Sequence, residues 1–224
     1  ILSDGRVDFL RLECANVLIW QLKKGRYRCL SFEPYTLRYL QAVSLGGKCK
    51  IQNLHIRRLG FPQSQREILT DYAPYRAIYE AAVESFRQNT LDIFMDCPSR
   101  ERAGWLCDSF FTARVEHILT GASKVERNFL ENFLLPERFS CLPEGMLPMC
   151  YPADHDNGVF IPNWAMWFVL ELEEYLARTG DRELVDAARE RVYGLLNYFV
   201  RFENEFGLLE RLESWVFVEW SHSD

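Results

Sequence analysis

The sequence lacks the features that would point to nucleic acid, a membrane or a nucleotide cofactor. It has no basic run, and its formal net charge is −6, which argues against nucleic acid and against an anionic membrane surface. No apolar stretch approaches transmembrane length, and no signal-peptide pattern is present. Neither a GxGxxG fingerprint nor a P-loop occurs. We therefore expect no cofactor, no nucleic-acid partner and no membrane insertion.

Metal-binding and disulfide patterns are also missing. The seven cysteines are odd in number and none has CxxC spacing, so we expect buried free thiols, which favours a reducing compartment. The segment Asp154-His155-Asp156-Asn157 carries cation-ligand types, but it lacks the glycine of an EF-hand loop. No metal site is predicted. No spacing ties a Cys to a His, so nucleophilic catalysis by a thiol is weakly supported.

The chain is instead rich in apolar and aromatic residues. Its 224 residues are 48% hydrophobic and 14% aromatic, which is enough for one large domain or parts of two and argues against disorder. It begins at Ile1 without Met and stops at Asp224, so we expect a piece of a longer protein. The compartment, cytoplasmic or periplasmic, and the oligomeric state stay open.

The first part of the chain, residues 1–60, has the pattern of short strands. Apolar runs and alternations of period two are separated by glycines, which is typical of an antiparallel sandwich. We predict that 1–60 is the C-terminal part of a β-sandwich domain and its linker, with too few strands for a closed core. The candidate strands are 7–12, 15–22, 26–32, 37–43 and 51–57.

From residue 61 onward the periodicity is helical. Apolar residues recur at i, i+3, i+4 and i+7, Asp71 and Asp181 are candidate N-caps, and Gly121 and Gly180 are candidate stops. Ser123 to Glu126 is a capping-box pattern. The prediction is an array of helical hairpins rather than alternating strands and helices. The expected helices run from 71 to 90, from 110 to 119, from 123 to 133, from 163 to 178 and from 181 to 199.

Between the third and fourth of these helices lies a long irregular segment. Residues 136–162 contain five prolines and two glycines, so no regular element is expected there. A loop of this length in a compact domain is usually functional.

The densest cluster of polar chemistry is the stretch 96–108, DCPSRERAGWLCD. Its three carboxylates are Asp96, Glu101 and Asp108, and glycosidic bond cleavage needs one carboxylic acid and a second carboxylate. The alternative interpretation is structural: Asp108 is then an N-cap, and Arg100, Glu101 and Arg102 form surface ion pairs. Composition alone leaves the two about equal.

The tryptophans favour the interpretation as a sugar-binding site, because an indole face covers the apolar side of a sugar ring. The relevant residues are Trp105, Trp164, Trp167, Trp215 and Trp220, of which Trp167 and Trp215 are expected in the core.

The stretch 96–108 resembles the signature of the bacterial α-L-rhamnosidases, glycoside hydrolase family 78. The resemblance continues in order over roughly residues 37 to 220, and the stretch 96–108 is its most specific part. The other matching segments are 37–40 (LRYL), 145–148 (GMLP), 161–164 (IPNW), 179–181 (TGD) and 215–220 (WVFVEW).

This resemblance implies a mainly α fold, an (α/α)6 barrel of the six-hairpin glycosidase type that follows a β-sandwich. Residues 61–224 would be the N-terminal half of that catalytic barrel. It also implies an inverting hydrolase that removes terminal α-L-rhamnosyl residues from a rhamnose-containing oligo- or polysaccharide or glycoside. Glu101 would be the general acid. The implied substrate-binding residues are Asp96, Arg100, Trp105, Asp108, Trp164, Glu219 and Trp220.

Three departures from the family pattern bear on substrate and mechanism. Asn163 stands where Asp is commoner, Cys107 stands where Gly is commoner, and Glu101 follows Arg100 directly. The family's water-activating Glu lies in the second half of the barrel, so we expect the general base beyond residue 224. The fragment alone would then be inactive. The alternatives are a non-catalytic carbohydrate-binding protein on the same helical frame, or a glycosidase of this barrel type for another sugar.

Overall fold

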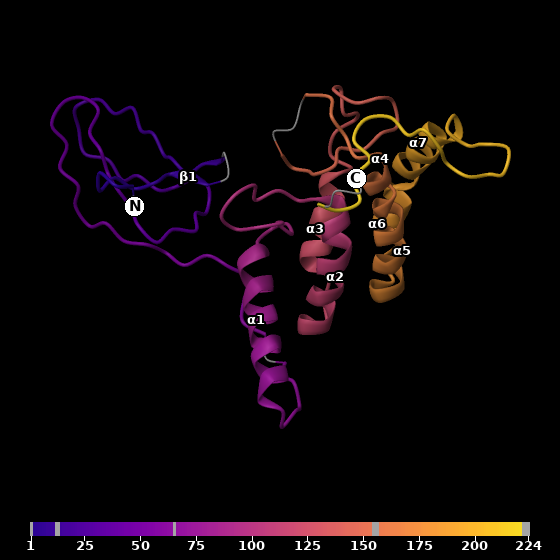
Figure 1. Cartoon of the computed structure of the whole chain (residues 1–224), viewed down its shortest axis with the longest axis horizontal. Coiled ribbons are helices and arrows are strands. Elements are labelled where there is room, and N and C mark those ends of the chain that lie inside the picture. Colours follow the sequence, from indigo (N-terminus) through magenta and orange to yellow (C-terminus); the bar gives the residue numbers. More distant parts are fainter. Residues whose placement is uncertain (1, 12–13, 65, 154–156, 221–224) are drawn as a thin grey trace.

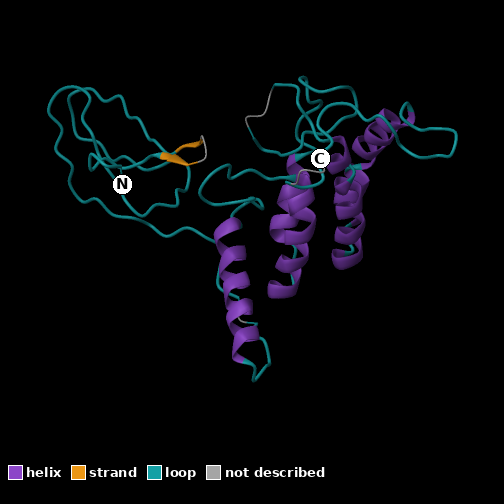
Figure 2. Ribbon diagram, viewed as in Figure 1, coloured by secondary structure: helices purple, strands orange, loops and turns teal. Residues whose placement is uncertain are grey.

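The computed structural model describes residues 2–11, 14–64, 66–153 and 157–220. Helices dominate its regular structure, and strand is confined to one short pair (Figure 2). The elements in chain order are β1 (Leu10–Arg11), β2 (Cys14–Ala15), α1 (Ala73–Asn89), α2 (Leu106–Thr120), α3 (Lys124–Asn132), α4 (Pro162–Ala165), α5 (Trp167–Thr179), α6 (Arg182–Ala187) and α7 (Arg189–Val200).

The part before residue 61 is built mostly of loops, and it lies beside the helices rather than among them (Figure 1). Strands β1 and β2 pair antiparallel, with Leu10 opposite Ala15. The strands predicted at 26–32, 37–43 and 51–57 are not formed in the described residues, so that prediction is wrong for this structure. An extended segment becomes a strand only when its backbone groups find a paired neighbour, and no such pairing of these segments occurs among the residues that the structure describes.

The helical part carries the hydrophobic core. Helices α2 and α5 pack against each other, and α3 packs against both. In Figure 1 the columns formed by α1, by α2 with α3 and by α5 with α6 stand side by side. Aromatic side chains fill the contact between α3 and its neighbours: Phe129 of α3 meets Phe94 of the loop before α2, and Phe133, just after α3, meets Phe129 and Phe168 of α5. The predicted mainly α class is confirmed.

Several helix ends fall where the sequence predicts them. Gly121 and Gly180 both adopt the left-handed conformation, with φ of 71° at each, and end α2 and α5. The Asp181 carboxylate accepts a hydrogen bond from the Leu184 amide at 3.2 Å and so caps α6. The long loop was predicted over 136–162: the described residues from 136 to 161 contain no helix, and α4 begins at Pro162.

Other helix details differ from the predictions. Helix α1 follows Tyr72 rather than Asp71, and Pro74 lies in its first turn in place of a side-chain cap. Two predicted helices are each divided, at Met166 into α4 and α5 and at Ala188 into α6 and α7. On α1 the predicted apolar stripe is buried only at its C-terminal end, since Phe86 is buried whereas Ile78 is exposed.

The predicted capping box at the start of α3 is wrong. Ser123 occupies the N-cap position but makes no capping hydrogen bond with its side chain. The Glu116 carboxylate of α2 instead accepts from the amides of Val125 and Glu126, at 2.9 and 3.0 Å. An acceptor from a neighbouring helix satisfies the first amides of α3 as well as a local cap would, but sequence spacing cannot reveal it.

Buried carboxylates join the central helices. Glu126 of α3 is fully buried and pairs with Arg178 of α5. Glu171 of α5 is also fully buried, and the Ser109 hydroxyl of α2 lies 2.7 Å from one of its oxygens. Buried polar groups of this kind are costly without partners, so the packing of α2, α3 and α5 depends on them.

All seven cysteines are free thiols, as predicted. The expectation that they are buried holds for Cys150 alone: three others are exposed and three are half-buried, namely Cys29, Cys49 and Cys141, and Cys14, Cys97 and Cys107. Cys29 and Cys49 lie in the loops before residue 61, where no core is available to cover them. In the part of the chain that the structure describes, no helix has both the length and the apolar character needed to cross a bilayer.

Candidate active site

Residues 96–105 lie in the loop between α1 and α2, and hydrogen bonds join the two ends of this stretch. The Asp96 amide donates to the Ala103 carbonyl oxygen at 3.1 Å, and the Ala103 amide donates to Asp96 Oδ1 at 3.1 Å. Asp96 therefore joins the two ends of the loop with both its backbone and its side chain. One carboxylate oxygen of Asp96 is used in this way, and residues 97–102 are held between the two ends.

The second half of the stretch pairs with the long loop. The Leu106 amide donates to the Met149 carbonyl at 3.0 Å, and the Tyr151 amide donates to the Gly104 carbonyl at 3.1 Å. A Cβ at Gly104 would lie 2.8 Å from the Phe129 ring and 2.9 Å from the Tyr151 carbonyl oxygen. Glycine is therefore required for this close approach, and the predicted functional loop does contact the predicted site.

Glu101 is held at both carboxylate oxygens. The Trp105 indole Nε1 donates to Oε2 at 3.1 Å, and the Arg100 guanidinium lies 2.7 Å from Oε1. The side chains of Arg100 and Glu101 are 34% and 30% exposed. The carboxyl group is thus oriented by two neighbours and still accessible from solvent.

Asp108 lies in the first turn of α2, where Trp105 rather than Asp108 is the N-cap residue. The structural interpretation of Asp108 as an N-cap is therefore wrong. Burial of the carboxyl, together with the negative charges of Asp96 and Glu101, raises the pKa of Asp108 to about 6. That coupling means that the three predicted carboxylates lie close enough to interact electrostatically.

Aromatic rings form a continuous wall beside these carboxylates. Trp105 meets Trp164 edge-to-face at 5.5 Å between ring centroids, Trp164 meets Phe217 at 5.4 Å, and Phe217 meets Trp220 at 5.0 Å. The Asn163 side-chain amide donates to the Phe217 carbonyl at 2.6 Å. Residues of the C-terminal segment are thereby brought to the start of α4 and to the stretch 96–108.

The outer members of the wall differ in their exposure. Trp220 is 83% exposed, although its ring contacts both Phe217 and Trp215. Glu219, its neighbour in sequence, is also exposed. Trp215 is half-buried in the wall, whereas Trp167 is half-buried against Phe110, away from it. Both tryptophans expected in the core thus pack against buried aromatic residues, Trp215 against Phe217 and Trp167 against Phe110, without being fully buried themselves.

Phe217 is the residue that the sequence analysis missed. It is 7% exposed and touches Trp164, Trp215 and Trp220, so it joins the wall together. A signal was present: in 215–218 aromatic residues alternate with valines, and Trp215 and Phe217 pack inward whereas Val216 and Val218 are exposed. The period of two indicates an extended segment with one packed face.

No group of three or more His, Cys, Asp or Glu side chains among the described residues is arranged to hold a metal ion. The Asp154-His155-Asp156 part of the cluster considered from the sequence lies outside the described residues.

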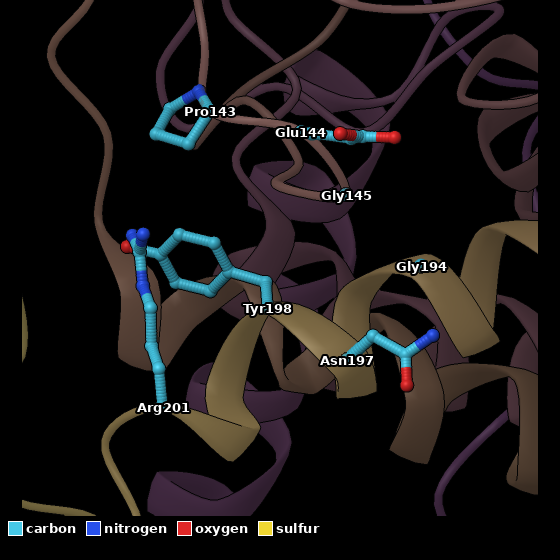
Figure 3. A pocket seen from close by; sticks show the side chains of 7 residues that line it. All are labelled: Pro143, Glu144, Gly145, Gly194, Asn197, Tyr198 and Arg201. Carbon is cyan, nitrogen blue, oxygen red and sulfur yellow. The ribbon is translucent and has the colours of Figure 1, made fainter.

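A separate cavity of about 330 Å³ lies between the long loop and α7 (Figure 3). Tyr198 and Arg201 of the α7 segment face Pro143 and Glu144 across it. None of the residues predicted for the site lines this cavity, so the stretch 96–108 with the aromatic wall remains the candidate active site.

Comparison with known proteins decides the family. Residues 65–224 match the model of the bacterial alpha-L-rhamnosidase six-hairpin glycosidase domain. The chain belongs to this family. The match includes the stretch 96–108, the long loop and the aromatic wall, and the helices described above are part of an α/α barrel, as the fold-class prediction states.

Two solved structures are similar to this member of the family. One is a family 78 rhamnosidase of Bacillus sp. GL1, with a TM-score of 0.58 and 24% identity over 74% of this chain and 16% of that protein. The other is a rhamnosidase from Klebsiella oxytoca with rhamnose bound, with a TM-score of 0.62 and 22% identity over 72% of this chain and 31% of that protein. The chain thus spans less than a third of either. No curated protein sequence matches it.

Proposed function

We propose that the protein hydrolyses terminal α-L-rhamnosyl residues of glycans or glycosides by an inverting acid/base mechanism, with Glu101 as the general acid. The observation that carries the proposal is the arrangement at Glu101. Its two oxygens are oriented by Trp105 and Arg100, two further carboxylates lie nearby, and an aromatic wall adjoins them. Membership of the six-hairpin glycosidase family supports the same reaction class.

The proposed division of labour follows from the chemistry of each group. Glu101 donates its proton to the glycosidic oxygen as the bond to C1 breaks. Asp96, Arg100 and Asp108 bind the sugar hydroxyls through charge-assisted hydrogen bonds. Trp105, Trp164 and Trp220 cover the apolar face and the methyl group of the sugar, with Glu219 beside them.

An inverting reaction needs a second carboxylate, about 6.5–9.5 Å from the acid, to activate the attacking water on the opposite face of the sugar. We propose that this base comes from outside the 224 residues. The long loop and the aromatic wall would then form one side of a pocket that further parts of the barrel complete.

Two departures from the family pattern concern the substrate preference. Burial raises the pKa of the Cys107 thiol to about 11, so Cys107 is a neutral group at physiological pH and not a nucleophile. Asn163 uses its amide nitrogen to hold Phe217 in the wall. A carboxylate at that position could not donate this hydrogen bond, so the substitution affects the wall rather than the acid.

Glu101→Gln in the full-length natural protein tests the assignment. On an α-L-rhamnoside with a poor leaving group, we expect kcat to fall about 10²–10⁴-fold. With an activated aryl leaving group, which needs little protonation, the loss is smaller. Glu205→Gln, in an exposed loop after α7, is the matched control and should leave both rates unchanged. Retention of kcat within a few-fold on the poor leaving group would exclude Glu101 as the acid.

The two alternatives are outcomes of the same assays. A carbohydrate-binding protein would bind L-rhamnose without turnover of any α-L-rhamnoside by the unmutated protein. A glycosidase for another sugar would be identified by a panel of aryl glycosides, in which a different sugar gives the highest kcat/KM.

A further inference from the structure

Arg102, the residue after the proposed acid, does not take part in the carboxylate cluster. Its guanidinium donates to Asn16 Oδ1 and to Glu33 Oε2, both at 3.2 Å, and lies 5.1 Å from the centroid of the Tyr35 ring. Its side chain is 15% exposed, about half the exposure of Arg100 and Glu101. All three partners come from the part of the chain before residue 61.

The backbone of Arg102 is in the left-handed region, with φ of 54°. A residue with a Cβ rarely adopts this conformation, which persists only where surrounding contacts require it. At Arg102 this conformation lets the side chains of two consecutive residues, Glu101 and Arg102, make contacts in different parts of the molecule. Glu101 contacts Trp105 and Arg100 within the loop, whereas Arg102 contacts the N-terminal segment.

A second contact attaches the same loop to the same segment. The Thr36 hydroxyl donates to the Pro98 carbonyl at 3.0 Å. Pro98 and Arg102 lie on either side of Arg100 and Glu101, so residues 16–36 hold the loop at two points that flank the proposed acid. In Figure 1 the loop after α1 extends away from the helices toward β1, in agreement with these contacts.

We propose that Arg102 is a positioning residue: by attaching the 96–105 loop to the N-terminal segment, it fixes the orientation from which Glu101 delivers its proton. The inference rests on the proposed function of Glu101. A segment outside the helical barrel thus sets the geometry of proton donation, because it holds Arg102 through Asn16, Glu33 and Tyr35.

The combination of partners accounts for arginine at this position. A planar guanidinium can donate to two separate acceptors while its face lies on an aromatic ring. A lysine ammonium is a compact charge and cannot satisfy the amide oxygen, the carboxylate and the ring together. The ion pair with the exposed Glu33 would by itself contribute little, so the contacts act as a set.

The decisive variants are Arg102→Gly, which accepts φ of 54° without strain but removes the side chain, and Arg102→Lys, which keeps the charge. Both are made in the full-length natural protein. The substrates are an alkyl α-L-rhamnoside and 2,4-dinitrophenyl α-L-rhamnoside. For Arg102→Gly we expect kcat to fall about 10–100-fold on the alkyl glycoside and less than about 3-fold on the dinitrophenyl glycoside, with KM unchanged within about 3-fold. Arg102→Lys should show the same selectivity with a smaller loss.

The control is Arg58→Ala, which removes a surface ion pair to Glu84. It should change neither rate. Equal losses of the Arg102→Gly variant on both substrates, or no loss on the alkyl glycoside, would overturn the proposal, because a misplaced acid affects the poor leaving group more.

Amide hydrogen exchange distinguishes failure of this inference from failure of the proposed function. Exchange of peptides covering 96–105 is measured in the unmutated protein and in the Arg102→Gly and Arg58→Ala variants. We expect at least about tenfold faster exchange for Arg102→Gly alone. If the unmutated protein hydrolyses no α-L-rhamnoside, the proposed function fails. If exchange in 96–105 is unchanged in Arg102→Gly, the attachment of this loop by Arg102 is overturned independently.

Discussion

The parts of the chain before and after residue 61 are both rich in apolar residues, but they differ in periodicity and very much in burial. In the first part Ile19, Phe32 and Leu45 are largely exposed, whereas in the second Phe129 and Phe168 are fully buried. Helices satisfy their own backbone hydrogen bonds, so they need only an apolar surface to pack on. Strands need a neighbouring strand to pair with, and the described residues of the first part form one pair of two-residue strands.

The two parts are in contact at the loop that carries the proposed acid. Arg102 and Pro98 of the candidate active-site loop contact Asn16, Glu33 and Thr36. The loop-rich part is therefore expected to contribute little to the stability of the helices but to affect the geometry of the site. The following predictions test that contrast, together with the activity predictions for Glu101 and Arg102 given above.

The largest expected difference is between a buried and an exposed phenylalanine. Phe129→Ala removes a ring that contacts Phe94 and Phe133 and lies against Gly104, so we expect the free energy of unfolding to fall by about 3–5 kcal/mol. Phe32→Ala, at a fully exposed ring, should stay within about 0.5 kcal/mol. Urea unfolding followed by circular dichroism at 222 nm measures both. A similar loss for the two variants would mean that the first part is packed after all.

A smaller difference is expected between two glycines with positive φ. Gly145 has φ of 83° and a Cβ there would overlap the Gly194 carbonyl oxygen, whereas Gly47 has φ of 73° and open space around it. Gly145→Ala combines backbone strain with overpacking and should lower the free energy of unfolding by about 2–4 kcal/mol. Gly47→Ala carries the strain alone and should cost about 1 kcal/mol. Equal costs in urea unfolding would contradict the close contact between the long loop and α7.

The smallest and most gradual effect concerns Glu171, whose pKa burial raises well above its ordinary value. The Glu126 charge acts in the same direction, and the Ser109 hydrogen bond and Arg178 oppose it. The folded state thus holds this proton more tightly than the unfolded state. The resulting stability is fully present below the ordinary carboxyl pKa of about 4.3 and is lost as pH rises toward the raised value.

Urea unfolding of the unmutated protein and of Glu171→Gln, from pH 4.5 to 8, measures this loss. Relative to Glu171→Gln, the free energy of unfolding of the unmutated protein should fall with a slope of at most about 1.4 kcal/mol per pH unit. Glu205→Gln, at an exposed position, should show no such difference. Parallel pH curves for the unmutated protein and Glu171→Gln would mean that Glu171 is ionised in the folded state throughout this range.

The sequence was sufficient for most of the helical part because its signals are local. The stops at Gly121 and Gly180 and the Asp181 cap depend on residues within one turn. The capping box predicted at 123–126 failed for the opposite reason: the first amides of α3 bond to Glu116, so donor and acceptor lie on different helices. Glu171 and Arg178 are similar cases, because a charged residue on a helix is expected to face solvent unless a partner from another helix is known.

Within the candidate site, residue types indicated the three carboxylates and the tryptophans as candidates, and the resemblance to the rhamnosidase signature implied that they serve one site. Only the tertiary structure decided which groups meet. It brought Phe217 between Trp164 and Trp220, oriented Glu101 between Trp105 and Arg100, and attached Arg102 to residues far away in the chain. The sequence gives the chemical groups that are available. The distances between them depend on packing and on backbone hydrogen bonds across many residues, which no local pattern encodes.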